Sequence, residues 1–251
     1  MQYTKKKAGA ALLAAILSLV ATPLAAQYKK GDWPSPVHDD FHYGKLMIDR
    51  LEYASGDEDR VQWDVDAWYG GDYNRLWFKS EGEDAVDNGG ETSNKLLFSR
   101  LIAPYWDFQA GLDYQKLYGG TQNPDRVSAV VGVQGLAPYW FETDAALLVS
   151  QDGDVSATLE GEYDWLLSQR LVLQGRLETL AAAQAVPEFA VSKGVNYVEG
   201  GFRLRYQIKR EFAPYVGFSR HQKLGNAADV ARAAGESKGD TAIILGVRMW
   251  F

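Results

Sequence analysis

The sequence predicts an all-β protein, an antiparallel transmembrane β-barrel of about twelve strands with short periplasmic turns and longer extracellular loops. Apolar and polar side chains alternate with a period of two beyond residue 44. The alternating segments are mostly 10 to 13 residues long, and the links between them are alternately short and long. Tryptophan and tyrosine are abundant, with 8 and 14 residues, as expected for aromatic belts at two membrane interfaces.

Each predicted strand has an apolar face and a charged face. In residues 105–114, Trp106 and Leu112 share one face while Asp107 and Asp113 share the other, because residues i and i+2 of a strand point the same way. Such segments exceed the common globular strand of about 5–6 residues and suit the roughly 9–11 residues that a tilted strand needs to cross a bilayer. The predicted strands are 44–54, 60–70, 74–83, 92–103, 105–116, 126–136, 139–150, 154–164, 170–180, 196–208, 211–222 and 239–251.

The links distinguish the two ends of the predicted barrel. Short links at 71–73, 104, 137–138, 166–169 and 209–210 alternate with longer ones such as 84–91, 117–125, 181–195 and 223–238. Outer-membrane barrels have short periplasmic turns and long extracellular loops, whereas a soluble β-sandwich has no reason to alternate in this way. The last segment has an apolar face that ends at Phe251, which suits a strand that pairs with the first and leaves no free edge.

The amino terminus has the pattern of a secretory signal peptide. Lys5, Lys6 and Lys7 precede an apolar run from Ala8 to Val20, and small residues lead to a cleavage site after Ala26. We therefore divide the chain into a signal peptide (1–26), a short periplasmic tail (27–43) and an outer-membrane β-barrel (44–251). With no cysteine, the chain has no disulfide framework, zinc ribbon or thiol nucleophile, and such a secreted chain is typical of a Gram-negative bacterium.

The charged strand faces should line the barrel interior. We single out six carboxylates as cation-attracting: Asp64, Asp66, Glu142, Asp144, Glu160 and Glu162. The same face is predicted to carry Glu81, Glu83, Asp107, Asp113, Glu178 and Glu199, with Arg75, Lys79, Arg100, Arg176, Arg203, Arg205 and Arg248. The plainer alternative is a structural network of ion pairs that fills a narrow interior. The excess of 33 acidic over 26 basic residues argues against a nucleic-acid partner.

Two further groups of residues carry possible chemistry. His38 and His42 flank two aspartates in the tail, and Met47 follows on the first strand. Imidazole and carboxylate suit Cu(II), and a thioether suits Cu(I), although histidines in such a tail can simply be solvated. Ser219 and His221 share a strand face and allow a lipid hydrolase, for which the sequence shows neither an orienting group nor an oxyanion hole.

Several blocks resemble the CopB/PcoB family of outer-membrane copper resistance proteins B. They include VHDDFHYGKLMIDRLEY, VGVQGLAPYWFETDA and LRLRYQIKREFAPYVGFSR, and the likeness runs from about Val37 to Phe251. The resemblance implies a monomeric barrel in outer-membrane lipid that works with a periplasmic multicopper oxidase of the CopA/PcoA type. Family members commonly have a Met- and His-rich amino-terminal segment, whereas residues 27–43 contain no Met. We therefore do not expect this tail to store copper in bulk.

The expected function is copper resistance and homeostasis without enzymatic activity. Copper, as Cu(I) or Cu(II), would be cargo that the barrel binds or passes across the outer membrane, with His38, His42 and Met47 as candidate ligands at the periplasmic end. Acidic lumen residues would raise the local cation concentration. The alternatives are a narrow general pore without a dedicated metal role and the barrel lipid hydrolase.

Overall fold

The structure, a computed structural model, describes residues 42–85, 89–120 and 123–251. The predicted signal peptide and all but the last two residues of the predicted tail lie outside these ranges. Within them, no helix is both long enough and apolar enough to span a membrane.

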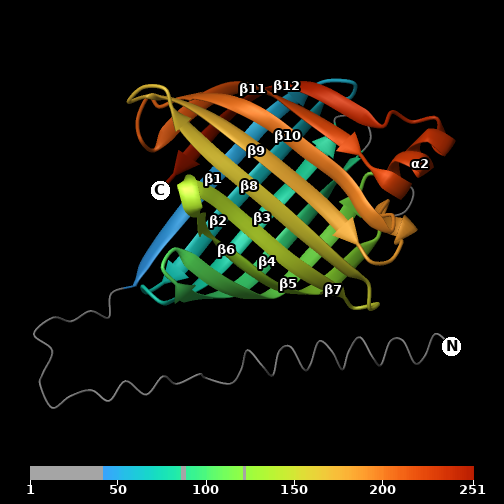
Figure 1. Cartoon of the computed structure of the whole chain (residues 1–251), viewed down its shortest axis with the longest axis horizontal. Helices are drawn as coiled ribbons and strands as arrows, with labels where there is room; N and C mark the ends of the chain where they lie inside the picture. Colours follow the sequence, from blue (N-terminus) through green and yellow to red (C-terminus); the bar gives the residue numbers. More distant parts are fainter. Residues whose placement is uncertain (1–41, 86–88, 121–122) are drawn as a thin grey trace, which may run out of the picture.

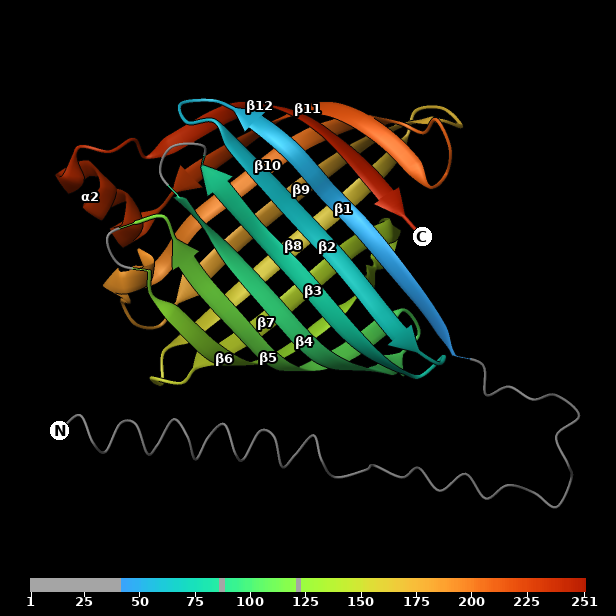
Figure 2. The same cartoon turned by 180° about the vertical axis from the view of Figure 1, so that it is seen from behind.

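Twelve strands of the described residues form one closed antiparallel barrel (Figures 1 and 2). Each strand pairs with its neighbours in sequence, and β1 pairs with β12, for example at Tyr53 and Leu245, so the sheet has no free edge. The strands are β1 (Tyr43–Ser55), β2 (Arg60–Gly70), β3 (Asn74–Ala85), β4 (Gly89–Ala103), β5 (Trp106–Tyr118), β6 (Asp125–Ala137), β7 (Phe141–Ser150), β8 (Val155–Leu166), β9 (Leu171–Ala182), β10 (Gly194–Tyr206), β11 (Phe212–Lys223) and β12 (Gly239–Trp250).

The predicted fold class and all twelve predicted strands are confirmed, with strand ends that differ by at most three residues. The links also contain short helical segments that the period-two pattern did not predict: η1 (Pro138–Trp140), η2 (Pro187–Phe189) and α2 (Gly225–Ala234). Helix α2 ends at Gly235, whose φ of 78° is the left-handed C-cap conformation that glycine adopts readily.

The barrel wall is apolar outside and polar inside. Leu76, Leu96 and Leu147 are more than half exposed on the outer face, whereas Arg203 and Arg205 inside are each 2% exposed. This arrangement matches a barrel whose outer surface contacts lipid and whose lumen is polar. The apolar side chains therefore face outward and the polar ones inward, as the sequence predicted.

Two positions differ from simple expectations about the faces. Arg100 was expected inside, but it follows Phe98 by two residues and pairs with Phe108 of β5, so it shares the outward face of these exposed aromatics.

On β1, the register shifts between Ile48 and Arg50. This β-bulge adds one residue to the strand, and as a result the consecutive residues Asp49 and Arg50 both contact partners inside the barrel.

The two ends of the barrel differ as predicted. Both termini of the barrel domain lie at the end with the short turns, and α2 stands at the opposite end, beside the long loops (Figures 1 and 2). We call these the short-turn end and the long-loop end. At the short-turn end, Tyr105, Tyr139 and Trp140 are highly exposed. At the long-loop end, the link after β9 brings Phe189 to 4.2 Å from the guanidinium of Arg126 on β6.

Candidate functional site

The interior wall contains all six carboxylates that the sequence singled out. Asp64 and Asp66 come from β2, Glu142 and Asp144 from β7, and Glu160 and Glu162 from β8. Most of them have a basic partner, such as Arg50, whose Nη2 lies 3.2 Å from Asp64. Within the described residues, Asp66 and Glu142 have no Lys or Arg nitrogen within 4.0 Å, and the buried Oδ1 of Asp66 has no hydrogen-bond partner there. Their attraction for cations stays a prediction.

The strand register aligns several acidic side chains in one row, which we call the acidic row. Its members are cross-strand partners, one from each strand from β5 to β12: Asp107, Gln134, Asp144, Glu160, Glu178, Glu199, His221 and Asp240. Barrel strands are tilted and staggered, so a line perpendicular to them climbs around the wall. Asp107 lies near the short-turn end of β5, and Asp240 lies near the long-loop end of β12. The acidic row thus leads from one end of the lumen to the other.

Like charges face each other along the middle of the acidic row. Asp144 is opposite Glu160, Glu160 is opposite Glu178, and Glu178 is opposite Glu199. Side chains in such positions have Cβ atoms about 4.5–5.5 Å apart, and like charges there destabilise a sheet. A fold that places four carboxylates side by side has a strongly negative strip on its inner wall.

Basic side chains offset part of this charge. The Arg176 guanidinium contacts Glu160 at 2.6 Å, Glu162 at 3.3 Å and Glu178 at 3.1 Å. From β3, Lys79 Nζ reaches across to Asp144 at 2.6 Å and donates to Gln134 on β6 at 3.1 Å. Lys79 thus cross-links β3 to β6 and β7, which are not its neighbours, whereas Arg176 joins carboxylates of β8 and β9. The interior of the described residues therefore contains an ionic network.

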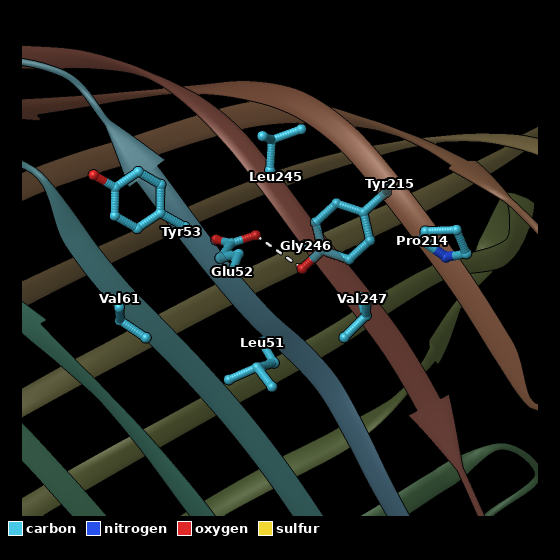
Figure 3. A pocket seen from close by; sticks show the side chains of 9 residues that line it. All are labelled: Leu51, Glu52, Tyr53, Val61, Pro214, Tyr215, Leu245, Gly246 and Val247. Carbon is cyan, nitrogen blue, oxygen red and sulfur yellow. Dashed lines mark hydrogen bonds between the residues drawn. The ribbon is translucent and has the colours of Figure 1, made fainter.

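A buried triad lies beside the seam where β1 meets β12. Arg203 on β10 donates two hydrogen bonds to Glu52, at 3.0 and 2.8 Å, and the Tyr215 hydroxyl donates a third at 3.0 Å. The Glu52 side chain has no exposed surface. Figure 3 shows Tyr215 reaching Glu52 past Gly246, which lies between them in the sheet. A Cβ at Gly246 would be 2.5 Å from Tyr215 Cζ, so the contact requires glycine there.

Sequence reasoning did not include several of these interior residues. Asp49, Arg50 and Glu52 all lie on β1, for which no face was assigned from the sequence. Alternation alone would place Glu52 inside with Arg50. It could not also place Asp49 there, because the bulge that turns Asp49 inward leaves no signal in the alternation.

The candidate copper ligands are not brought together by the described structure. His42 stands before β1 and stacks on Tyr69 with ring centroids 5.8 Å apart, on the outward side. The Met47 sulfur lies inside, 3.6 Å from Arg248 Nη2. Five residues of extended chain separate the two by about 16 Å, too far for one metal ion. His38 lies outside the described residues, and the role of all three as ligands stays a prediction.

No metal centre is preformed in the described part of the chain, where no group of three or more His, Asp or Glu side chains is arranged to hold an ion. The geometry for a hydrolase is also incomplete. In the same part of the chain, the Oγ of Ser219 has no hydrogen-bond partner, and His221 Nδ1 lies 3.3 Å from Glu199 instead. The contact between nucleophile and base that such an enzyme uses is therefore not made.

The closed barrel, apolar outside and charged inside, defines a β-barrel protein whose fold is that of outer-membrane porins. A crystal structure of the NanC porin shares this fold with a TM-score of 0.52 at 12% identity, over 81% of this chain and 98% of that chain. The chain belongs to the copper resistance protein B family, because the family model for the copper resistance protein B precursor (CopB) matches residues 42–251.

Two curated relatives agree with this assignment. Copper resistance protein B of Escherichia coli is 37% identical over 218 residues, which cover 86% of this chain and 72% of that protein. A copper resistance protein B homolog of Pseudomonas syringae pv. tomato (strain ATCC BAA-871 / DC3000) is 32% identical with the same coverage. The resemblance noted in the sequence is confirmed. The family supports a role in copper resistance and favours a non-enzymatic one.

Proposed function

We propose that the barrel spans the outer membrane and passes copper ions between the long-loop end outside and the short-turn end in the periplasm. The acidic row carries this proposal. Carboxylates that line a narrow path attract cations and raise their local concentration. Three consecutive like-charge pairs destabilise an empty barrel, and a cation that moves along the row relieves this repulsion.

When no copper is bound, the carboxylates of the acidic row are held in ion pairs. Lys79 and Arg176 neutralise the middle of the row. These contacts therefore disfavour an open, unselective channel. A cation must compete with the two basic side chains for the carboxylates. Copper therefore moves from carboxylate to carboxylate by displacing ion pairs, and the barrel acts as a filter.

The short-turn end suits transfer to a periplasmic partner. His42 is exposed there, next to the segment that contains His38, and a multicopper oxidase of the CopA/PcoA type would receive copper from these imidazoles. The barrel acts as a monomer in this proposal, because its sheet is closed without a second copy and its apolar band is covered by outer-membrane lipid.

Copper flux into vesicles tests the proposal. The protein is expressed from its full-length sequence and purified from membranes in detergent. It is then reconstituted into vesicles that contain a copper-sensitive dye, and the vesicles are exposed to Cu(I), Cu(II) or Zn(II). We expect copper-dependent flux that Glu178→Gln lowers. Removing one charge about 4 Å from a cation in water weakens the attraction by about 1 kcal/mol, or roughly fivefold. The matched control is Asp229→Asn on α2, where the carboxylate is 67% exposed.

Three outcomes would overturn parts of the proposal. Copper flux equal to that of empty vesicles would refute copper passage. A large, steady conductance for every ion would identify a general pore. Equal flux through the wild type and the Glu178→Gln variant would show that the acidic row is a structural network only.

A further inference from the structure

His221 is the one nitrogen ligand among the carboxylates of the acidic row. Its cross-strand partners are Glu199 on β10 and Asp240 on β12. It lies two residues before the end of β11, near the long-loop end. A cation that enters from that end therefore meets an imidazole before it reaches the carboxylates in the middle of the row.

The imidazole of His221 is held in one orientation with one nitrogen left available. Nδ1 lies 3.3 Å from Glu199 Oε2, and the ring packs on Tyr197 with centroids 4.7 Å apart. The Tyr197 hydroxyl is itself fixed by a 2.7 Å hydrogen bond to Glu178. Nε2 makes no hydrogen bond within the described residues, and the side chain is 27% exposed. A metal-binding histidine usually donates its other ring N–H to a carboxylate in this way.

Glu199 differs from the other carboxylates of the acidic row. Within the described residues it has no Lys or Arg nitrogen within 4.0 Å, and its ion-pair partner is His221. Every other carboxylate of the row contacts a basic side chain: Asp107 with Arg75, Asp144 with Lys79, Glu160 and Glu178 with Arg176, and Asp240 with Arg60. The negative charge beside His221 is therefore available to a cation bound by the imidazole.

An unused oxygen donor lies next to this pair. Ser219 precedes His221 by two residues on the same strand face and is 1% exposed, yet its Oγ has no hydrogen-bond partner among the residues that the structure describes. Ser219 and Glu199 line the same crevice, which has no room for a water molecule. A buried hydroxyl without a partner costs about 1–3 kcal/mol, and neither the fold nor the ion pairs around it account for this one.

We propose that His221 is the copper-selecting ligand of the lumen. It binds the ion through Nε2 while Glu199 orients the ring through Nδ1 and contributes its charge. Imidazole favours copper and zinc, whereas sites made only of oxygen ligands suit magnesium and calcium. This inference rests on the proposed copper passage and names the residue that makes the acidic row distinguish copper from hard cations.

The test compares His221→Gln with the otherwise wild-type protein in detergent, by Cu(II) titration and by the electron paramagnetic resonance spectrum of bound Cu(II). Both proteins carry His38→Ala and His42→Ala, so that the tail imidazoles do not contribute. We expect nitrogen hyperfine splitting when His221 is present and its loss in the variant. Even a residue that only orients a metal ligand changes affinity by about 10- to 100-fold, so copper affinity should fall at least tenfold. Magnesium flux into vesicles should stay unchanged. Glu199→Gln keeps the imidazole and should retain the nitrogen signal with weaker binding.

Arg220→Gln is the matched control, because Arg220 is the preceding residue and its side chain is exposed on the outer face. Heat-dependent gel mobility shows that each variant is folded. Wild-type protein that neither binds nor passes copper would refute the proposed function itself. Wild-type protein that binds copper with an affinity and spectrum unchanged by His221→Gln would refute only the role of His221.

Discussion

The buried Glu52 triad gives a sharp prediction about stability. Glu52 accepts two hydrogen bonds from Arg203 and one from Tyr215, and its side chain is fully buried. Arg203→Met removes the guanidinium and leaves the carboxylate with the tyrosine alone. Removing one partner of a buried pair costs about 3–5 kcal/mol. We expect the lower half of this range, because Arg50 lies on the same inner face of β1 and partly balances the charge.

Two further variants separate the charge effect from packing. Tyr215→Phe removes one hydrogen bond to a charged group and should cost about 1.5–3 kcal/mol. The double variant Glu52→Gln/Arg203→Met removes both charges. It should recover most of the loss, because replacing both members of a buried pair is often neutral.

Urea unfolding in lipid vesicles, followed by the fluorescence of the 8 Trp residues, measures these free energies. The unfolding free energy should rank wild type close to the double variant, then Tyr215→Phe, then Arg203→Met. A loss below about 1 kcal/mol for Arg203→Met, with no recovery in the double variant, would mean that water or other basic groups solvate Glu52. That result is the one expected of an exposed ion pair, and it would refute the full burial of the Glu52 carboxylate.

Three other predictions concern side-chain contacts of the barrel wall and its interior. Gly246→Ala puts a Cβ 2.5 Å from the Tyr215 ring, and this overpacking should cost about 1–3 kcal/mol in the urea assay. Gly161→Ala, with its nearest atom 4.0 Å away, should be close to neutral. Lys79→Met removes a cation beside the acidic row and should raise cation conductance in planar bilayers by roughly fivefold; unchanged conductance would count against the row as the path. Ser99→Ala removes a buried hydroxyl that has no hydrogen-bond partner within the described ranges and should raise the unfolding free energy by about 1 kcal/mol. A loss of stability would contradict this expectation.

The strands could be found from the sequence because each one carries its own local pattern of alternating side chains. A strand that separates lipid from a polar lumen must alternate residue by residue, so the pattern is written into each segment independently of its neighbours. The short links 104 and 137–138 then mark where the chain reverses. The helix α2 was missed because it lies in the link between β11 and β12, outside the barrel wall, where the period-two pattern gives no information.

The sequence by itself determined the fold class, the strands and the inward face of residues such as Asp144 and Glu160, because these depend on local alternation and segment length. Only the tertiary structure decided which inward side chains meet. Strand register and barrel stagger, which involve residues far apart in the chain, align the acidic row, put Glu199 beside His221 and bring Arg203 to Glu52. The separation of His42 from Met47 is local by contrast, because five residues of extended chain lie between them and the two side chains face opposite sides of the barrel wall.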